Sequence, residues 1–387
     1  MKSKRNSIKY IAFYDTLGNH LENRKFHLSA TNKIDYIIST IKQNGMDVEI
    51  VSPSWTKNLK GFYKGKKTTI SDTVSLKLFH TFGTKYKILK MILYIYTLLQ
   101  LMFYLIVNTK QRETVIVYHA PMLSFPLRLV KKIKQLNIIL EVEEIYTNVT
   151  ANKFFEKQEY KIFNIADKFI FPTESLNEIL NKENKPHIII HGTYQVEEVR
   201  EDKSYYGKIH IVYAGTFDKI KGGAYNAVSI ARYLPDNYYI HIIGFGSDQE
   251  KKQLIEEINT ISKISKCKIT FDGLLSGENY IKFIQNCDIG LSTQSPDAIY
   301  NETSFPSKIL SYMANGLRVV TTRIKVIEQS AIGDDVYYYN TQNPHDIAAT
   351  ILNIDLDSEY DSRAILNRLN NSTINKIGWL LDIEKKI

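Results

Sequence analysis

The sequence predicts an α/β protein with two doubly wound parallel sheets, and three observations lead to this prediction. Short, nearly continuous apolar segments alternate with segments of helical period through most of the 387 residues. Such strands are typical of parallel sheets that helices cover on both faces. A charged stretch without apolar period, QVEEVREDKSYYGK (195–208), interrupts the alternation, which then restarts. The chain is also longer than one ordinary hydrophobic core requires.

The N-terminal half, expected to form a domain over residues 1–194, carries the first set of strands. They are KYIAFY (9–14), DVEIVS (47–52), TVIVYHA (114–120), NIILEVE (137–143), DKFIFPT (167–173) and HIIIHG (187–192). Between the first two, Ile34, Ile37, Ile38 and Ile41 recur at helical spacing, and Gly45 marks the end of that helix. Residues 195–208 are then expected to be the linker between the domains.

The C-terminal half repeats the pattern and predicts a second domain over residues 209–358. Its strands are IHIVYAGT (209–216), YYIHIIGFG (238–246), KITFDG (268–273), DIGLSTQ (288–294), LRVVTT (317–322) and VYYYN (336–340). Asn343 followed by Pro344 is a favourable start for a helix. The tail, 359–387, is predicted to be helical and able to cross back to the N-terminal domain. In two such sheets facing a cleft, ligands bind beyond the carboxyl ends of the strands.

Composition and charge limit the class of protein. Hydrophobic content of 44% and charged content of 24% are those of a soluble globular chain. Cys267 and Cys287 give neither a disulfide framework nor a metal-ligand spacing, and MKSKRNSIKYIAFY lacks the apolar run of a signal peptide, so a cytoplasmic location is expected. A net charge of +9 suits phosphorylated substrates or an anionic membrane, or is an ordinary lysine-rich surface. No nucleic-acid-binding signature is present, so no nucleic-acid partner is expected.

One segment, KILKMILYIYTLLQLMFYLIVN (87–108), is apolar nearly all round and long enough to cover a bilayer core. Spanning a membrane would put strands of one sheet on opposite sides, so the sequence argues against it. Two interpretations stay open. The helix is either a deeply buried connection or lies in an anionic membrane interface as a peripheral contact, helped by nearby basic residues, namely Lys77, Lys85, Lys87, Lys110 and Arg112.

The stretch NETSFPSKILSYMANGLRVVTT (301–322) sets Lys308 in the first turn of a helix, where the dipole is already positive. Pro306 suits that first turn, and Asn301, Thr303 and Ser304 precede it as caps. We therefore expect an anion such as a phosphate to join Lys308. The alternative is an ordinary surface lysine.

A second turn, in VYAGTFDKIKGGAYNA (212–227), carries glycines and lysines at the same sheet edge. Gly215 lets the backbone approach a ligand, and Lys221 offers positive charge. Neither the dinucleotide fingerprint nor the phosphate-binding loop ending in Gly-Lys-Ser/Thr is present. Together with Lys308, this turn suggests a two-sided clamp for a diphosphate.

The second half, about 209–352, resembles the nucleotide-sugar-binding domain of family 4 retaining glycosyltransferases of the GT-B fold. VYAGTFDKIKGG is similar to the opening strand and Lys-Gly turn of that family, IIGFGSD to its second glycine loop, and FDGLLSGENYIKFIQNCDIGLSTQ to its G-x-L … D-I/V block. SFPSKILSYMANGLRVVTT is similar to its Phe-Pro-Ser-Lys block, which is the most specific match. The first half resembles the family in architecture alone.

The resemblance implies transfer of a sugar, with retention, from a nucleoside-diphosphate sugar such as a UDP-sugar, with no required metal ion or other cofactor. Lys221 and Lys308 would neutralise the diphosphate. The other donor-binding residues expected are Gly18, Gly215, Thr216, Gly244, Glu302, Ser304, Phe305, Pro306, Ser307 and Ser311.

The chain departs from the family pattern at three positions. Thr216 stands where the family often has arginine, and Ser311 where it usually has a glutamate that grips the ribose. Thr303 stands where its earlier glutamate, near the reacting sugar, would fall, with Glu302 one place away. Either the donor contacts differ or the activity is weakened.

Four further candidate residues lie in the first half. The resemblance places His119 near the donor sugar; a histidine satisfied inside the fold is the alternative. Glu143 and Glu144 end a strand and could orient the acceptor or act as base, and Glu144 is otherwise a solvated charge. Gly18, in DTLGNH (15–20), permits close passage of the backbone by a ligand, or forms an ordinary turn.

We therefore expect a glycosyltransferase that uses a nucleoside-diphosphate sugar and a saccharide or lipid-linked saccharide acceptor at the inner membrane face, in surface-polysaccharide or glycan assembly. A nucleotide-sugar epimerase of similar form is one alternative, against which the Phe-Pro-Ser-Lys block argues. A catalytically silent, glycosyltransferase-like subunit is another, suggested by Thr303 and Ser311.

Overall fold

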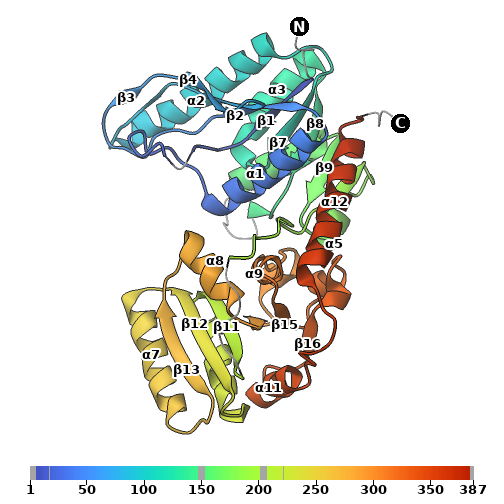
Figure 1. The fold of residues 1–387 in the computed structure, drawn as a ribbon. Helices are drawn as coiled ribbons and strands as arrows, with labels where there is room; N and C mark the ends of the chain where they lie inside the picture. Colours follow the sequence, from blue (N-terminus) through green and yellow to red (C-terminus); the bar gives the residue numbers. More distant parts are fainter. Residues whose placement is uncertain (1–5, 17, 147–152, 201–206, 221, 384–387) are drawn as a thin grey trace. The chain divides into compact units, whose positions relative to one another are not determined.

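The computed structural model describes residues 6–16, 18–146, 153–200, 207–220 and 222–383, and it confirms the α/β architecture with parallel sheets (Figure 1). Two compact units are present. Unit 1 comprises Met1–Pro172, Leu176–Thr193 and Ser372–Ile387, and unit 2 comprises Thr173–Ser175 and Tyr194–Asn371. The expected linker, 195–208, lies partly outside the described residues.

Unit 1 is built on an eight-stranded sheet with the order β10-β9-β8-β7-β1-β2-β5-β4. Its strands are β1 (Ser7–Ile11), β2 (Asp47–Ser52), β4 (Lys66–Ser71), β5 (Val74–Leu78), β7 (Thr114–Tyr118), β8 (Asn137–Glu141), β9 (Lys168–Phe171) and β10 (His187–Ile189). All neighbours are parallel except β4 and β5, which form an antiparallel hairpin at the edge. A separate pair consists of β3 (Phe62–Tyr63) and β6 (Thr81–Phe82).

The strands β3 to β6 were not predicted. The sequence of β4, KKTTIS, has no apolar alternation because the strand is almost wholly exposed at the sheet edge. Lysines on such an edge discourage pairing with another chain. In β5, VSLKL, alternate residues are buried, which is the period-2 pattern of a short strand with one buried face.

The helices of unit 1 cover both faces of its sheet. They are α1 (Leu28–Gln43), α2 (Lys87–Asn108), the short η1 (Pro121–Leu123), α3 (Ser124–Lys134), α4 (Lys153–Ile165), most of α5 (Glu174–Leu180) and the last part of α12 (Ser362–Leu380). Leu101 of α2, Leu127 of α3 and Phe163 of α4 share one apolar core with the sheet. The end of α12 is held by Asn44, whose Nδ2 donates to the Ile374 carbonyl at 2.8 Å, and by Lys168, whose Nζ donates to the Leu380 carbonyl at 2.8 Å.

Helix α2 is not deeply buried, so that interpretation of 87–108 was wrong. Four of its side chains are buried, at a spacing of four residues: Leu93, Thr97, Leu101 and Leu105. Among the described residues it is the one helix long and apolar enough to cross a membrane, and 22% of its most apolar window is buried. Because β5 before it and β7 after it belong to the same sheet, the argument against spanning still applies.

Unit 2 contains a six-stranded, wholly parallel sheet with the order β13-β12-β11-β14-β15-β16. Its strands are β11 (Ile209–Thr216), β12 (Tyr238–Phe245), β13 (Lys268–Gly273), β14 (Ile289–Ser292), β15 (Arg318–Thr322) and β16 (Tyr337–Tyr339). Each lies within the segment predicted for it. Their carboxyl ends form one edge, and Gly215 and Thr216 lie at that edge at the end of β11.

The helices of unit 2 pack on both faces of this sheet. They are α6 (Gly223–Ser229), η3 (Ile230–Tyr233), α7 (Asp248–Ser262), α8 (Gly277–Gln285), η4 (Ile299–Glu302), α9 (Lys308–Ala314), α10 (Lys325–Glu328), η5 (Gly333–Asp335), α11 (Pro344–Leu352) and the first part of α12. The predicted start of α11 is confirmed, since the Asn343 side chain accepts from the His345 amide at 3.0 Å and Pro344 follows.

Candidate functional site

A pocket of about 300 Å³ opens in unit 2 at the carboxyl end of β11, beside the start of α9. Its lining brings together two predicted segments that are far apart in the sequence. The lining residues are Tyr213, Gly215, Thr216, Gly223, Gln294, Asn301, Ser304, Phe305, Pro306, Ser307 and Lys308. The Phe-Pro-Ser-Lys block and the glycine turn therefore meet at one hollow, as a clamp requires.

Lys308 is the first residue of α9, so it lies in the first helical turn as predicted. Its Nζ is 4.4 Å from the centroid of the Tyr213 ring, within the range of a cation–π contact. The predicted capping was wrong in detail. The helix begins after Ser307, whose side chain makes no cap bond, and Asn301 Nδ2 instead donates to the carbonyls of Ser295 at 2.7 Å and Pro296 at 3.0 Å.

The two glycines beside Lys308 make room for a tyrosine. A Cβ atom on Gly215 would lie 2.9 Å from the Tyr213 hydroxyl oxygen, and one on Gly223 would lie 2.6 Å from it. That hydroxyl donates to the Thr216 carbonyl at 3.0 Å. The glycines therefore leave space for the Tyr213 side chain next to Lys308. This packing explains both glycines without a bound ligand.

Gly244 has a structural role that differs from the donor-binding one expected for it. Its φ of +142° is outside the range of ordinary side chains, and a Cβ there would lie 1.8 Å from the Gly215 carbonyl oxygen. Gly244 pairs with Gly215 in the β11–β12 ladder and does not line the pocket. A glycine is therefore required at position 244 for β11 and β12 to pair there.

Tyr312 attaches α9 to the sheet. Its hydroxyl accepts from the Ala214 amide at 2.7 Å and donates to the Leu291 carbonyl at 3.3 Å, joining the helix to β11 and β14. Burial raises the pKa of Tyr312 well above its usual range, so this hydroxyl stays protonated. The backbone around Lys308 is thus fixed against both central strands.

Other residues predicted for the donor site do not line this pocket. Ser311, expected at the ribose, shares a hydrogen bond of 3.0 Å with the Tyr280 hydroxyl. The Thr303 carbonyl accepts from Thr173 Oγ1 at 2.8 Å, and Glu302 is exposed. Lys221, the second arm of the predicted clamp, lies outside the described residues.

The sequence reasoning missed two lining residues, Tyr213 and Gln294, and it expected Asn301 only as a cap. Gln294 follows β14 and Tyr213 lies near the end of β11, so both belong to the edge where ligands were expected. Gln294 Nε2 donates to Asn301 Oδ1 at 3.4 Å, which links the loop after β14 to the loop before α9. The order of strands in the sheet was the missing information.

His119 of unit 1 is buried inside the fold, as its alternative expected, but neither ring nitrogen has a hydrogen-bond partner among the described residues. Its ring is fully buried between those of Tyr146 and Phe163, at centroid distances of 5.2 and 4.8 Å. Burial lowers the pKa of His119 to about 3, so the ring is neutral at physiological pH. Its Nε2 is 3.4 Å from Glu159 Oε1, but a neutral ring forms no ion pair.

Acidic residues gather where β8 ends. Glu143 forms an ion pair of 2.5 Å with Lys33, which also donates to the Ile190 carbonyl at 2.9 Å. Burial, together with the charge of Glu143, raises the pKa of Glu144, so Glu144 is not a simple solvated charge. Burial also raises the pKa of Glu141, a residue that the sequence reasoning missed, and the Tyr10 hydroxyl donates to it.

Two further expectations concern Gly18 and metals. Gly18 is exposed, and a Cβ there would meet nothing within 4 Å, so the turn itself does not demand glycine. Within the described residues, no group of three or more histidine, cysteine, aspartate or glutamate side chains could hold a metal ion.

Residues 208–356 match the family model described as glycosyl transferases group 1. No curated protein matches the chain. The matched segment covers most of unit 2, including every residue that lines its pocket.

Solved structures of similar fold cover nearly the whole chain. The E. coli trehalose-6-phosphate structure bound with UDP-2-fluoro glucose has a TM-score of 0.65 at 11% identity, covering 99% of this chain and 100% of its own. The alpha,alpha-trehalose 6-phosphate synthase from Burkholderia multivorans has a TM-score of 0.64 at 9% identity, covering 98% and 96%. The alpha,alpha-trehalose-phosphate synthase (UDP-forming) from Burkholderia xenovorans, in complex with glucose-6-phosphate, has a TM-score of 0.61 at 11% identity, covering 97% and 98%.

At these identities the structural similarity establishes the fold, which is GT-B as expected. The family match in unit 2 and this fold together support a glycosyltransferase.

Proposed function

We propose that this chain is a retaining glycosyltransferase of family 4 whose unit 2 pocket holds the diphosphate of a nucleoside-diphosphate sugar, UDP-sugar in the first instance. The acceptor is a saccharide or lipid-linked saccharide, and the reaction contributes to surface-polysaccharide or glycan assembly in the cytoplasm, at the inner membrane face. His119 and Glu144 belong to unit 1 and do not line the unit 2 pocket.

The position of Lys308 is the observation that carries the donor part of the proposal. Among the described lining residues it supplies the one charged side chain, beside the hydroxyls of Thr216, Ser304 and Ser307. An ammonium group and hydroxyl donors at a single hollow suit a diphosphate leaving group, whose developing charge they stabilise without a metal ion. A bound UDP-sugar analogue in a structure of the same fold supports the choice of nucleotide.

Calorimetric titration with UDP tests this donor site. Lys308→Met keeps the length of the side chain and removes its charge, and a lost charge-assisted contact costs about 1.5–3 kcal/mol, or roughly 10- to 150-fold in Kd. Lys252→Met, an exposed residue of α7, is the matched control and should bind like the wild type. Equal affinity of both variants and the wild type would remove the basis of the proposal.

Turnover assays test the chemistry separately from binding. We expect slow hydrolysis of a UDP-sugar without acceptor, insensitive to a metal chelator, and an α-configured product from an α-linked donor by proton NMR. Binding of UDP without any hydrolysis or transfer would instead favour the catalytically silent subunit. The observation that supports this alternative is Ser311, which stands in place of the expected glutamate and shares a hydrogen bond with Tyr280.

The membrane part of the proposal depends on helix α2. Large apolar side chains of α2 are exposed along its length, for example Ile88 at 70% and Phe103 at 69%. An amphipathic helix with such a face lies in a membrane interface, next to a lipid-linked acceptor. Flotation with vesicles tests this docking, and failure of the wild-type chain to float would contradict it.

A further inference from the structure

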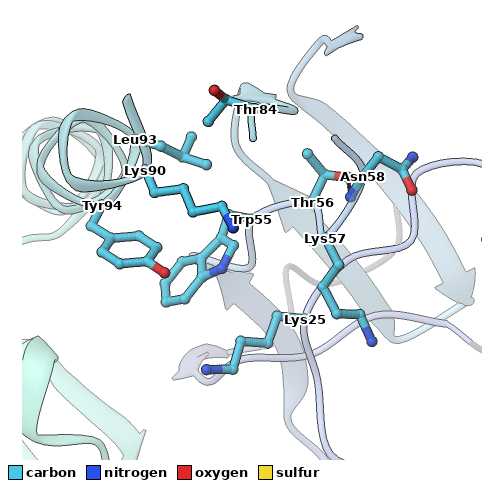
Figure 2. Close-up of a pocket in the computed structure, with 9 residues that line it drawn as sticks. All are labelled: Lys25, Trp55, Thr56, Lys57, Asn58, Thr84, Lys90, Leu93 and Tyr94. Atoms are coloured by element: carbon cyan, nitrogen blue, oxygen red, sulfur yellow. Dashed lines mark hydrogen bonds between the residues drawn. The ribbon is translucent and has the colours of Figure 1, made fainter. Parts of the chain in front are cut away.

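A second pocket, also about 300 Å³, lies in unit 1 between the start of α2 and the loop that follows β2. Its lining residues are Lys25, Trp55, Thr56, Lys57, Asn58, Thr84, Lys90, Leu93 and Tyr94. Figure 2 shows Lys90 extending from α2 towards Trp55, with Lys57 and Lys25 on other sides of the same hollow. We call this the lysine–aromatic pocket.

The aromatic part of this pocket is rigid. Trp55 is 7% exposed, and its ring lies 4.5 Å from that of Tyr94 and 5.2 Å from that of Phe13. Lys25 Nζ is 5.2 Å from the Trp55 ring, in cation–π range. The lysines are therefore arranged around a fixed, buried indole, unlike lysines scattered on a surface.

The positive charge of this pocket is not neutralised by the protein. In the neighbouring hairpin, Lys66 pairs with Glu22 at 2.6 Å and Lys67 with Glu49 at 2.5 Å. Within the described part of the chain, Lys25, Lys57 and Lys90 form no ion pair, and no carboxylate lines the pocket. Three ammonium groups around one hollow repel each other unless an anion joins them.

The charge of the whole chain is concentrated in this region. Residues 53–90 contain nine lysines and a single aspartate, a net charge of +8 that the pairs of Lys66 with Glu22 and Lys67 with Glu49 reduce to +6, against +9 for all 387 residues. A second hollow, lined by Asn58, Leu59, Lys60, Tyr63 and Lys85, shares Asn58 with the pocket and extends the basic surface. A basic surface of this extent attracts an anionic membrane.

An apolar stripe on α2 adjoins the basic surface. Its residues recur every three or four positions and are exposed: Ile88, Ile92, Ile95, Leu99, Phe103 and Val107. This stripe lies across the helix from Lys90 and Leu93. An α-helix is about 10 Å wide, and an interfacial helix sinks its apolar face about 5–10 Å below the headgroups. The lysine–aromatic pocket would then lie at the depth of the lipid phosphates.

We propose that the lysine–aromatic pocket binds the phosphate group of an anionic membrane lipid while the apolar stripe of α2 lies in the bilayer. This deepens the membrane part of the proposed function by naming the group that is recognised. The ammonium groups of Lys25, Lys57 and Lys90 donate to the phosphate oxygens, and Trp55 and Tyr94 contact the apolar part of the lipid next to it.

Flotation of the full-length chain with three kinds of vesicle tests the proposal. The first is phosphatidylcholine alone, the second contains phosphatidic acid, and the third contains cholesteryl hemisuccinate, a carboxylate amphiphile, adjusted to the same surface potential. We expect tight binding to the phosphatidic acid vesicles alone. Equal binding to the hemisuccinate vesicles would overturn phosphate recognition, since both surfaces attract lysines equally.

Variants separate the pocket from general charge. Lys57→Gln with Lys90→Gln should weaken binding about 30-fold, because a lysine near an anionic surface contributes about a factor of five. The charge-matched control, Lys64→Gln with Lys87→Gln, removes two exposed lysines of unit 1 that do not line the pocket, and it should weaken binding clearly less. Equal losses of vesicle binding in the two double variants would refute phosphate binding by the pocket.

Failure of this inference can be told from failure of the proposed function. The double variant Leu99→Glu with Phe103→Glu should abolish flotation. If it does, and the pocket variant still binds the vesicles like the wild type, membrane docking by α2 is supported and the phosphate site is refuted. UDP titration of the pocket variant should match the wild type because the donor pocket lies in unit 2, and an unchanged melting curve verifies that unit 1 is folded. Lys308→Met should float normally whatever its affinity for UDP.

Discussion

The Tyr312 hydroxyl is a buried group on which the geometry of the donor pocket depends, and Tyr312→Phe removes it with little change in volume. In the wild type this oxygen accepts from the Ala214 amide at 2.7 Å and donates to the Leu291 carbonyl at 3.3 Å. The ring stays in place, because it packs against Gly290, where a Cβ would lie 2.4 Å from it. The substitution therefore tests the hydrogen bonds rather than the packing.

The expected cost follows from the partner that is left behind. Without the hydroxyl, the Ala214 N–H loses its 2.7 Å acceptor in a partly buried position, and an unsatisfied donor away from water costs about 1–3 kcal/mol. For a unit of this size, each kcal/mol lowers the melting temperature by about 2–4 °C. We expect a fall of roughly 2–12 °C and weaker UDP binding, since α9 carries Lys308.

Calorimetric melting of the wild type and the variant measures this effect. Tyr233→Phe, which removes a hydroxyl from a side chain that is 44% exposed, is the control and should shift the melting temperature hardly at all. If Tyr312→Phe melts like the control and binds UDP like the wild type, α9 is held by packing alone and the reasoning about its attachment is refuted.

Three more predictions concern Gly244, His119 and Glu141. Gly244→Ala should prevent soluble folding or cost more than about 3 kcal/mol, because its Cβ would lie 1.8 Å from the Gly215 carbonyl oxygen; Gly273→Ala, with φ +76° but open space around it, should cost only about 1–2 kcal/mol in urea denaturation. Burial lowers the pKa of His119 to about 3, so below about pH 6.5 the unfolded chain binds a proton that the folded chain excludes. Relative to His119→Phe, the wild type should therefore lose about 1.4 kcal/mol of unfolding free energy per pH unit as the pH falls from 6.5, and parallel pH profiles would contradict this. Burial raises the pKa of Glu141, so its folded form keeps a proton that the unfolded form releases above about pH 4.3. The free energy of unfolding of Glu141→Gln should therefore rise relative to that of the wild type as the pH rises towards 8. A difference in unfolding free energy that does not change with pH would disprove a neutral Glu141.

Much of the fold could be predicted because apolar strands in a parallel sheet are buried on both faces. The sequence of β11 is nearly continuous in apolar residues from Ile209 to Ala214, and β2, β11 and β13 have the bounds that were predicted. The edge hairpin was missed because its outer strand is exposed and polar. The exposed stripe of α2 could not be predicted, since a helix that is apolar all round has no period to show which side faces solvent.

The sequence predicted two local segments of the donor pocket, the block from Ser304 to Lys308 and the turn with Gly215 and Thr216. On its own, the block from Ser304 to Lys308 left an ordinary surface lysine open, and its pairing with the glycine turn and its family resemblance indicated a ligand. Tyr213 and Gln294 join it through the adjacency of β11 and β14, which sequence order does not reveal. The burial of His119 likewise depends on α4, a helix distant in sequence, which supplies Phe163.

The place of Lys308 at a helix start has a physical explanation that does not require a bound anion to keep the side chain in position. The Tyr213 ring, 4.4 Å from Nζ, offers a negative face that offsets the unfavourable helix dipole. That ring can lie there because Gly215 and Gly223 leave space for its hydroxyl. The ammonium group is therefore held in place before a diphosphate arrives, and a preorganised charge is what stabilises a leaving group without further rearrangement. On this argument, Tyr213→Leu should weaken UDP binding although Tyr213 carries no charge, and unchanged affinity would mean that Lys308 is positioned in some other way.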